Sequence, residues 1–221
     1  MLYCIYKICG VNQYPEKDLG FSWYCIDTEK EEAMQEAKVS AAEALTKLKE
    51  GNQRYLTATT NTGDISSQIR KYTCDEGQSP YAIIVTCSDS RVIPESIFMA
   101  GIGELFVIRV AGNVMDKHQL GSVEYAADHL GTKLVVVLGH EHCGAVGAAM
   151  GSKPGGYEQY ITDEICKAIG DEKDEKRACC LNVERSVSVI KESLGIQDGE
   201  DGLKVCGAFY NIGSGQVEFL D

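Results

Sequence analysis

The stretch KLVVVLGHEHCG, residues 133–144, places an unbroken apolar run directly before two histidines, a glutamate and a cysteine. Short, β-branched apolar runs of this kind are typical of strands that are buried on both faces. Three further runs share the pattern: YAIIVTC (81–87), LFVIRVA (105–111) and LKVCGAFY (203–210). We therefore expect four buried strands, with reactive side chains at the end of the 133–139 strand.

Helical patterns separate these runs. LGSVEYAADHL (120–130) has helical spacing, and a later helix has one apolar face. That face consists of Val183, Val187, Ile190 and Leu194. Strands that alternate with helices predict crossover connections, and hence an α/β fold with a mainly parallel central sheet flanked by helices. The last run, GQVEFL (215–220), follows a glycine-containing turn and predicts a carboxy-terminal edge hairpin.

The amino-terminal part has its own patterns. Residues 1–27 are aromatic and cysteine-rich, and they predict a short hairpin. Thr28 and Glu31 match a capping box, and the helical spacing that follows predicts a long amino-terminal helix that ends at Gly51.

Composition excludes several classes of function. Acidic residues outnumber basic ones by 33 to 21, so nucleic acid, which requires clustered Lys and Arg, is not an expected partner. No apolar run approaches the roughly 20 residues that span a bilayer, and the start of the chain lacks a signal-peptide pattern. We expect a cytoplasmic protein with a small-molecule substrate. Most of its ten cysteines are expected to be reduced, with Cys179 and Cys180 packed as small apolar side chains.

Two of the predicted strands are followed by residues of types that commonly bind metals. Cys87 lies at the end of the run at 81–87, and His140 and Cys143 follow the run at 133–139. Ligands of open α/β sheets bind beyond the carboxyl ends of the strands, so these residues are expected to converge. Two cysteines and one histidine are a catalytic zinc set that leaves one tetrahedral position for water. On the first turn of a helix, His140 and Cys143 would share a face, and His142 would point away from the ion.

Asp89 and Arg91 lie two residues apart, in a predicted turn just after Cys87. The guanidinium group can grip the carboxylate in a bidentate fork, which keeps the aspartate ionised and oriented. Next to a metal, this carboxylate can accept the proton of a bound hydroxide and direct its lone pair at a substrate. The alternative is an ordinary surface ion pair.

With these residues in place, the sequence resembles the β-class carbonic anhydrases. The motifs CSDSRV (87–92) and GHEHCGA (139–145) are similar to the two signatures of that family, in the same order and with similar separation. The similarity extends over roughly residues 38–221. It implies a catalytic domain there, preceded by an amino-terminal extension of unknown role at residues 1–37.

The resemblance also implies a function and its residues. The function is the reversible hydration of carbon dioxide to bicarbonate and a proton, by attack of zinc-bound hydroxide. Carried over position by position, the ligands of one Zn²⁺ per chain are Cys87, His140 and Cys143, the catalytic dyad is Asp89 with Arg91, and the substrate-binding residues are Gln78, Phe106 and Tyr125. In relatives these last three line a cleft at a dimer interface, which implies a homodimer or a dimer of dimers.

Some positions depart from the family pattern. Ile84 stands where a bicarbonate-regulated subset has tryptophan, so that regulation is not expected, and Glu141 and His142 stand where small or neutral residues are frequent. His142 or His118 is a candidate proton relay, because imidazole titrates near neutral pH. Two other functions stay open: hydrolysis of carbon disulfide or carbonyl sulfide at the same site, and a non-catalytic zinc or thiol module in which Asp89 is a fourth ligand.

Overall fold

The computed structural model describes residues 39–151, 155–196 and 202–220. The chain divides into two units, Met1–Glu36 and Ala37–Asp221, and all described residues belong to the second. The predicted hairpin within residues 1–27 lies outside the described residues. The described elements, in chain order, are α2 (Ala41–Tyr55), α3 (Ser67–Glu76), β1 (Ala82–Thr86), α4 (Pro94–Ile97), β2 (Leu105–Arg109), the 3₁₀ turn η2 (Ala111–Asn113), α5 (Lys117–Asp128), β3 (Leu134–His140), α6 (Gly144–Met150), α7 (Glu158–Ile169), α8 (Glu175–Leu194), β4 (Lys204–Tyr210) and β5 (Val217–Leu220).

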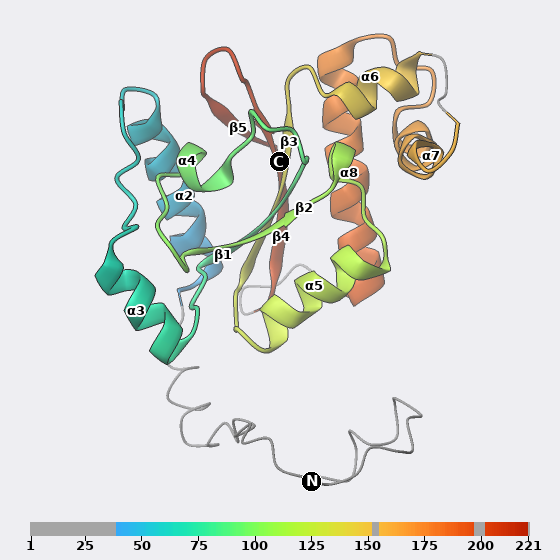
Figure 1. Ribbon diagram of the computed structural model, residues 1–221. Coiled ribbons are helices and arrows are strands. Elements are labelled where there is room, and N and C mark those ends of the chain that lie inside the picture. The colour runs from blue at the N-terminus through green and yellow to red at the C-terminus, as the bar shows by residue number, and fades with distance from the viewer. Residues whose placement is uncertain (1–38, 152–154, 197–201, 221) are drawn as a thin grey trace, which may run out of the picture. The chain divides into compact units, whose positions relative to one another are not determined.

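A five-stranded sheet in the order β2-β1-β3-β4-β5 forms the centre of the fold (Figure 1). β1 pairs in parallel with β2 and with β3, β3 pairs in parallel with β4, and β5 returns antiparallel to β4. β1 and β3 are interior strands in which every residue is buried, as their continuous apolar runs require. The predicted α/β fold, with a mainly parallel sheet and a carboxy-terminal edge hairpin, is confirmed.

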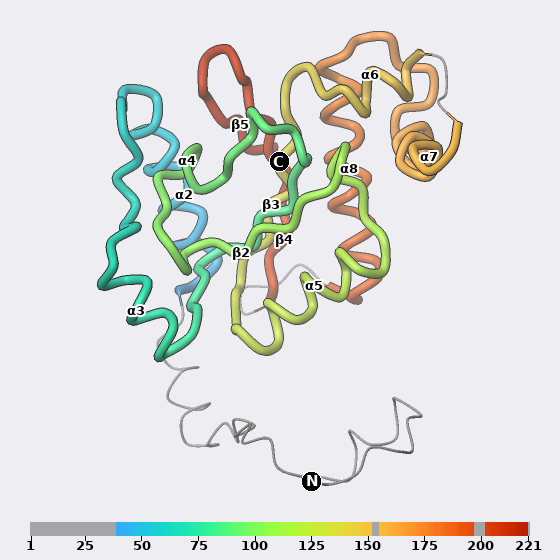
Figure 2. Tube along the Cα trace, in the orientation of Figure 1, coloured from blue at the N-terminus to red at the C-terminus, as the bar shows by residue number. Residues whose placement is uncertain are grey.

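Helices cover both faces of the sheet (Figure 1). On one face, Leu48 of α2 packs in an apolar cluster with Ile84 of β1. On the other face, Val183 of α8 packs with Ile83 of the same strand. Neighbouring strand residues enter different clusters because side chains alternate between the two faces of a sheet. The trace in Figure 2 shows how the chain leaves β1, passes through α4 and returns as the edge strand β2.

The long amino-terminal helix differs from its prediction at both ends. Ser40 caps a helix that begins at Ala41, because its hydroxyl accepts the Glu43 amide and the Glu43 carboxylate accepts the Ser40 amide. The predicted start at Thr28 lies outside the described residues, but a continuous helix through Ser40 is wrong. The helix also continues past Gly51 to Tyr55.

Gly51 serves close packing and is not a helix stop. A Cβ at this position would lie 2.0 Å from the carbonyl oxygen of Phe98, so only glycine allows α2 to approach the α4 segment this closely. α3, α4 and α7 are not predicted by the sequence patterns, and the helix expected to begin near His140 begins at Gly144, as α6. α3 is unusual, because none of its ten residues is buried.

The cysteines of the described part of the chain agree with the expectation of reduced thiols. All seven of them are free. Cys179 and Cys180 are 2% and 8% exposed, as expected for small apolar side chains. Over the ranges that the structure describes, no helix combines the length and the apolar character needed to cross a membrane.

Candidate metal centre

The three predicted metal ligands lie together at the carboxyl ends of β1 and β3. Cys87 directly follows β1, His140 is the last residue of β3, and Cys143 immediately precedes α6. Their ligand atoms all lie within 4.8 Å of one another, and the three residues are 5%, 1% and 3% exposed. The parallel pairing of β1 with β3 brings the two strand ends to one edge of the sheet, which is why residues far apart in sequence meet there.

A helical turn does not explain the spacing of His140 and Cys143, so that part of the prediction is wrong. His140 belongs to a strand and Cys143 is the N-cap of α6. The two residues between them form a turn, in which His142 has a φ of 53°. Non-glycine residues rarely occupy this left-handed region. The turn brings both ligand side chains to one point.

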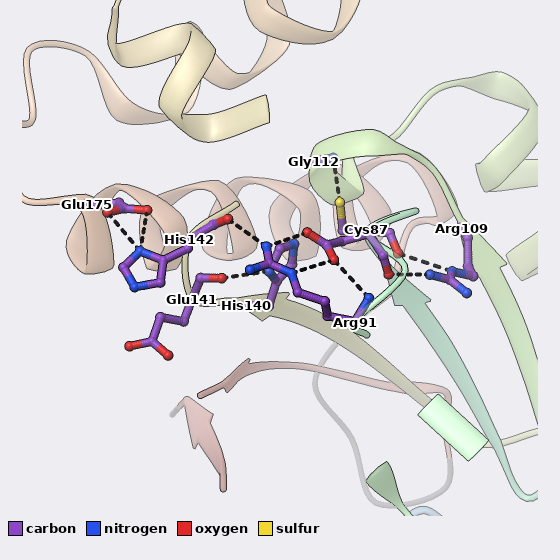
Figure 3. Close-up of polar contacts among 9 residues, drawn as sticks. Cys87, Arg91, Arg109, Gly112, His140, Glu141, His142 and Glu175 are labelled. Carbon is purple, nitrogen blue, oxygen red and sulfur yellow. Dashed lines mark hydrogen bonds and ion pairs between the residues drawn. The ribbon is translucent and has the colours of Figure 1, made fainter. Parts of the chain in front are cut away.

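His142 itself points away from this point. Its side chain is 66% exposed, and Nδ1 lies 3.2 Å from Oε1 of Glu175, in the first turn of α8 (Figure 3). The structure therefore places only the first histidine of the HEHC stretch beside the two cysteines.

His140 has one nitrogen available for a metal. Its Nδ1 lies 2.9 Å from the carbonyl oxygen of Glu141. A carbonyl can only accept, so Nδ1 carries the proton and Nε2 carries a lone pair. Nε2 is buried and has no hydrogen-bond partner among the residues that the structure describes. A buried acceptor without a partner, next to two sulfur atoms, fits the role of a metal ligand.

The hydrogen bond between the two thiols favours a thiolate at Cys87 and a thiol at Cys143. The pKa of Cys87 falls to about 4, chiefly because the Cys143 thiol donates a hydrogen bond to its sulfur, and despite burial. The pKa of Cys143 is raised, because it provides that hydrogen bond and is itself buried. The Cys87 thiolate and the Glu141 carbonyl also outweigh the effect of burial on His140 and raise its pKa. A divalent cation in place of the shared proton would let both sulfurs be thiolates, so the residues fit a zinc ion.

Asp89 and Arg91 form a bidentate pair beside these ligands. Nη2 of Arg91 donates to Oδ2 over 2.7 Å, and its Nε and backbone amide donate to Oδ1 over 3.0 and 2.9 Å. These hydrogen bonds hold the pKa of Asp89 well below its usual range. Arg91 Nη2 also donates to the carbonyl oxygen of His142 over 3.1 Å (Figure 3). This hydrogen bond links the Asp89–Arg91 pair to the turn between His140 and Cys143.

Arg109 is a residue of the site that sequence reasoning missed. It ends β2, and it donates from Nε to the carbonyl oxygen of Cys87 over 3.1 Å and from Nη2 to that of Asp89 over 2.7 Å (Figure 3). It thereby fixes the backbone of the loop that bears a ligand and the carboxylate. The sequence contained a signal, because Arg109 is the one charged residue within the apolar run LFVIRVA (105–111).

The predicted substrate-binding residues lie elsewhere in the chain. Gln78 is exposed and precedes β1, and Phe106 is the second residue of β2. α5 follows β2 and runs back along the sheet, so Tyr125 falls in its last turn, with its ring 6.2 Å from that of Phe106. All three therefore lie toward the amino ends of the strands, whereas Cys87 lies at the carboxyl end. One chain does not bring them to the metal ligands.

The fold and the ligand set together define an α/β protein with a candidate metal centre at the carboxyl edge of its sheet. Comparison with known proteins identifies the family. Residues 82–217 match the family model described as carbonic anhydrase, and the chain belongs to this family.

Several known proteins are similar to this chain. It is 42% identical over 127 residues to carbonic anhydrase 2 of Mycobacterium tuberculosis, and 39% identical over 127 residues to a carbonic anhydrase of Mycolicibacterium smegmatis. Each match covers 55% of this chain and 61% of the relative, so the chain spans less than two thirds of the length of these relatives.

Two solved structures give the same result for the fold. A β-carbonic anhydrase of Aspergillus fumigatus matches with a TM-score of 0.61 and 29% identity, over 70% of this chain and 83% of that one. A structure described as a tetrameric β-carbonic anhydrase of Sordaria macrospora matches with a TM-score of 0.59 and 30% identity, over 70% and 87% of the two chains. The predicted β-carbonic anhydrase fold is thereby confirmed.

Proposed function

We propose that this chain catalyses the reversible hydration of carbon dioxide to bicarbonate and a proton, with Zn²⁺ as its cofactor. One observation carries the proposal: a buried cysteine–histidine–cysteine set meets an arginine-held carboxylate at one edge of the sheet. The activity named for the Mycobacterium tuberculosis and Mycolicibacterium smegmatis relatives supports it.

Cys87, His140 and Cys143 are the proposed ligands of the ion. Three protein ligands leave one position of a tetrahedron open, which is the arrangement of catalytic rather than structural zinc sites. Zinc bound there would supply a nucleophile at neutral pH, because it lowers the pKa of water from 15.7 to about 7. The burial of all three side chains keeps bulk water away from the sulfur and nitrogen donors.

Asp89 is proposed to orient the attacking oxygen by accepting its hydrogen at Oδ2. A carboxylate offers about four acceptor positions. Among the described residues, Oδ1 accepts two N–H groups and Oδ2 accepts one, all from Arg91. About one acceptor direction on Oδ2 is thus left for the reacting water. Because Arg91 keeps the pKa of Asp89 low, the carboxylate accepts this hydrogen bond without taking up the proton.

The same pairing argues against a non-catalytic module in which Asp89 is a fourth ligand. A metal would have to compete with the Arg91 guanidinium for both carboxylate oxygens. Bidentate arginine–carboxylate pairs are the strong, directional kind. The other alternative, hydrolysis of carbon disulfide or carbonyl sulfide, would use the same metal ligands as hydration of carbon dioxide. Turnover of carbon dioxide and of the sulfur compounds therefore has to be compared directly.

A second copy of the chain is proposed to complete the substrate pocket, in a homodimer or a dimer of dimers. The three predicted pocket residues lie toward the amino ends of the strands, away from the metal ligands of their own chain. These residues are Gln78, Phe106 and Tyr125. Their surroundings are open in one chain: Tyr125 is 47% exposed and Tyr72 of α3 is 61% exposed. A neighbour that covers this surface would bring the amide and both rings to the metal centre of its partner. There they would form a small, mostly apolar pocket suited to an uncharged substrate.

We further propose residues 38–221 as the catalytic domain, residues 1–37 as an extension, and the cytoplasm as the location of the protein. The family match lies wholly within the proposed domain. Free cysteines throughout the described residues suit a reducing compartment.

The test of the proposed function measures bound zinc and the rate of carbon dioxide hydration for the wild type and for Asp89→Ala. We expect about one zinc per chain in both proteins, and a rate about 10²- to 10⁴-fold lower in the variant, because a positioned proton acceptor contributes that much. Carbonyl sulfide serves as the control substrate. Zinc without carbon dioxide hydration at any pH would refute the proposal, and faster turnover of carbonyl sulfide would assign the second function.

A further inference from the structure

A short turn after β2 donates a hydrogen bond to one of the proposed metal ligands. In η2, the backbone amide of Gly112 lies 3.3 Å from Sγ of Cys87, above the sulfur as drawn in Figure 3. The turn requires glycine here, because φ is 67° and a Cβ would lie 2.7 Å from Cδ1 of Ile165 and 3.1 Å from Cβ of Ala145. The amide therefore reaches the sulfur from a different segment than the one that bears Cys87.

The turn is held in this shape by two buried polar side chains of α8. Nδ2 of Asn182 donates to the carbonyl oxygen of Gly112 over 2.7 Å, and Oγ of Ser186 donates to that of Asn113 over 2.9 Å. The two residues are one helical turn apart and so face the same way. They are 2% and 3% exposed, which makes their polar atoms costly to bury without such partners.

The backbone of the η2 turn is in a sparsely populated conformation, so it is expected to change if its hydrogen bonds to α8 are removed. Asn113 has a φ of 45°, in the left-handed region, and its Nδ2 is buried without a hydrogen-bond partner among the described residues. Backbone in sparsely populated conformations persists only where the surroundings impose it, and such sites are often functional. Here the surroundings that impose it are Asn182 and Ser186.

We propose that Asn182 and Ser186 are positioning residues, which hold the Gly112 amide on the Cys87 sulfur and so limit the negative charge that this thiolate donates to the metal. The inference rests on the proposed zinc site. Hydrogen bonds to ligand sulfur withdraw charge from it and are a general means of tuning metal centres. Other amides around the two sulfurs come from the ligands' own segments, Asp89 for Cys87 and Ala145 and Val146 for Cys143. Among these amides of the described residues, that of Gly112 lies in the turn whose carbonyl groups accept hydrogen bonds from Asn182 and Ser186 of α8.

The test uses the full-length protein loaded with Co²⁺ in place of zinc, and compares the wild type with Asn182→Ala and Ser186→Ala. Loss of an N–H to sulfur hydrogen bond raises the energy of the sulfur lone pair, so the sulfur-to-cobalt charge-transfer band should move to lower energy in both variants. Metal affinity, measured by competition with a chelator, should fall about 10- to 100-fold, as for other residues that support ligands.

Two further variants separate positioning from a general effect on α8. Ser188→Ala is the matched control. The Ser186 hydroxyl lies 3.1 Å from the carbonyl oxygen of Asn182, four residues earlier, as well as near that of Asn113. The Ser188 hydroxyl likewise donates to the carbonyl four residues earlier on the same helix, but its hydrogen bond does not involve η2. Its spectrum and affinity should equal those of the wild type. Ser186→Thr keeps the hydroxyl and should restore the band position.

The outcomes are distinct. Variants that bind cobalt with an unmoved band overturn the inference, even if their affinity falls, because a merely structural role would lower affinity alone. A band that moves equally in Ser188→Ala also overturns it. A wild type that binds no cobalt would refute the proposed metal site, and this inference with it.

Discussion

Within one chain, the groups at the carboxyl ends of the strands are buried and held by hydrogen bonds, whereas the groups at the amino ends are largely exposed. At the carboxyl edge, Cys87, His140 and Cys143 are at most 5% exposed, and hydrogen bonds from other segments fix the surrounding loops. At the amino edge, Gln78 is exposed, Tyr125 is 47% exposed, and α3 has no buried residue. A single chain thus brings the proposed metal ligands together but leaves the predicted pocket residues exposed. This difference supports the proposal that the two halves of the active site belong to different copies of the chain.

The largest effect is expected at the carboxyl edge. Cys143→Ala removes one of three proposed ligands, so bound zinc should be lost and carbon dioxide hydration should fall to the uncatalysed rate. Metal analysis and stopped-flow hydration assays measure both. Cys180→Ala is the matched control, since Cys180 is 8% exposed in the same apolar cluster but is not part of the ligand group. Equal loss of zinc in the control would count against the assignment of the ligands.

The next largest effect tests the amino edge. Gln78→Ala should keep its zinc and lower kcat/KM about 10-fold or more, because it removes a polar contact to the substrate while the metal centre is intact. Mixing this variant with Cys143→Ala, after dissociation and reassociation, should then restore activity. In random dimers, about a quarter of all sites would combine intact ligands from one chain with an intact Gln78 from the other. No gain in activity on mixing would show that Gln78 does not act across an interface.

A smaller effect concerns the dependence of stability on pH. Arg91 holds the pKa of Asp89 below its usual value, so the folded state is favoured above the ordinary aspartate pKa of about 3.9, and this contribution is lost as the pH falls below it. The wild type should therefore be more stable than Asp89→Asn at pH 7. The difference should begin to shrink as the pH falls below about 3.9, and it should vanish only below the lowered pKa of Asp89 in the folded protein. Because the Arg91 side chain is 48% exposed, the difference should be small. Thermal unfolding across pH measures it, and a difference that grows on acidification would contradict the pairing.

The smallest effect is expected for His142→Ala. The side chain contacts Glu175 and points away from the ligands, while the carbonyl that Arg91 contacts belongs to the backbone and survives the change. Zinc content should be unchanged, and turnover at high buffer concentration should stay within about threefold, as for a residue outside the reacting groups. We also expect the dependence of turnover on buffer concentration to stay the same. A loss of activity confined to low buffer would instead identify His142 as a proton relay.

Local sequence signals account for the sheet and for much of the site. The strand that contains Ile83 and Ile84 is predictable because its residues are apolar without interruption, and Cys87 and His140 are predictable because reactive residues follow such strands. The start of α2 is harder. Thr28 with Glu31 and Ser40 with Glu43 are equally good capping boxes in sequence, and only the structure shows that the second one caps the helix.

The environment of the ligands depends on contacts between distant segments, which no local pattern contains. Gly112 is bound by Asn182 and its neighbour Asn113 by Ser186, residues that lie 70 and 73 positions further along the chain. Likewise, His142 adopts a left-handed conformation because the turn joins β3 to α6 there. The identity of the residue alone does not predict that conformation.

X-ray absorption at the zinc edge, on the full-length protein, distinguishes the proposed three-ligand zinc centre at the carboxyl ends of β1 and β3 from other zinc sites. Binding by Cys87, His140, Cys143 and one water predicts two sulfur atoms at about 2.3 Å and two lighter atoms at about 2.0–2.1 Å, one of them from histidine. A shell of four sulfur atoms, or a shell with no sulfur, would contradict it.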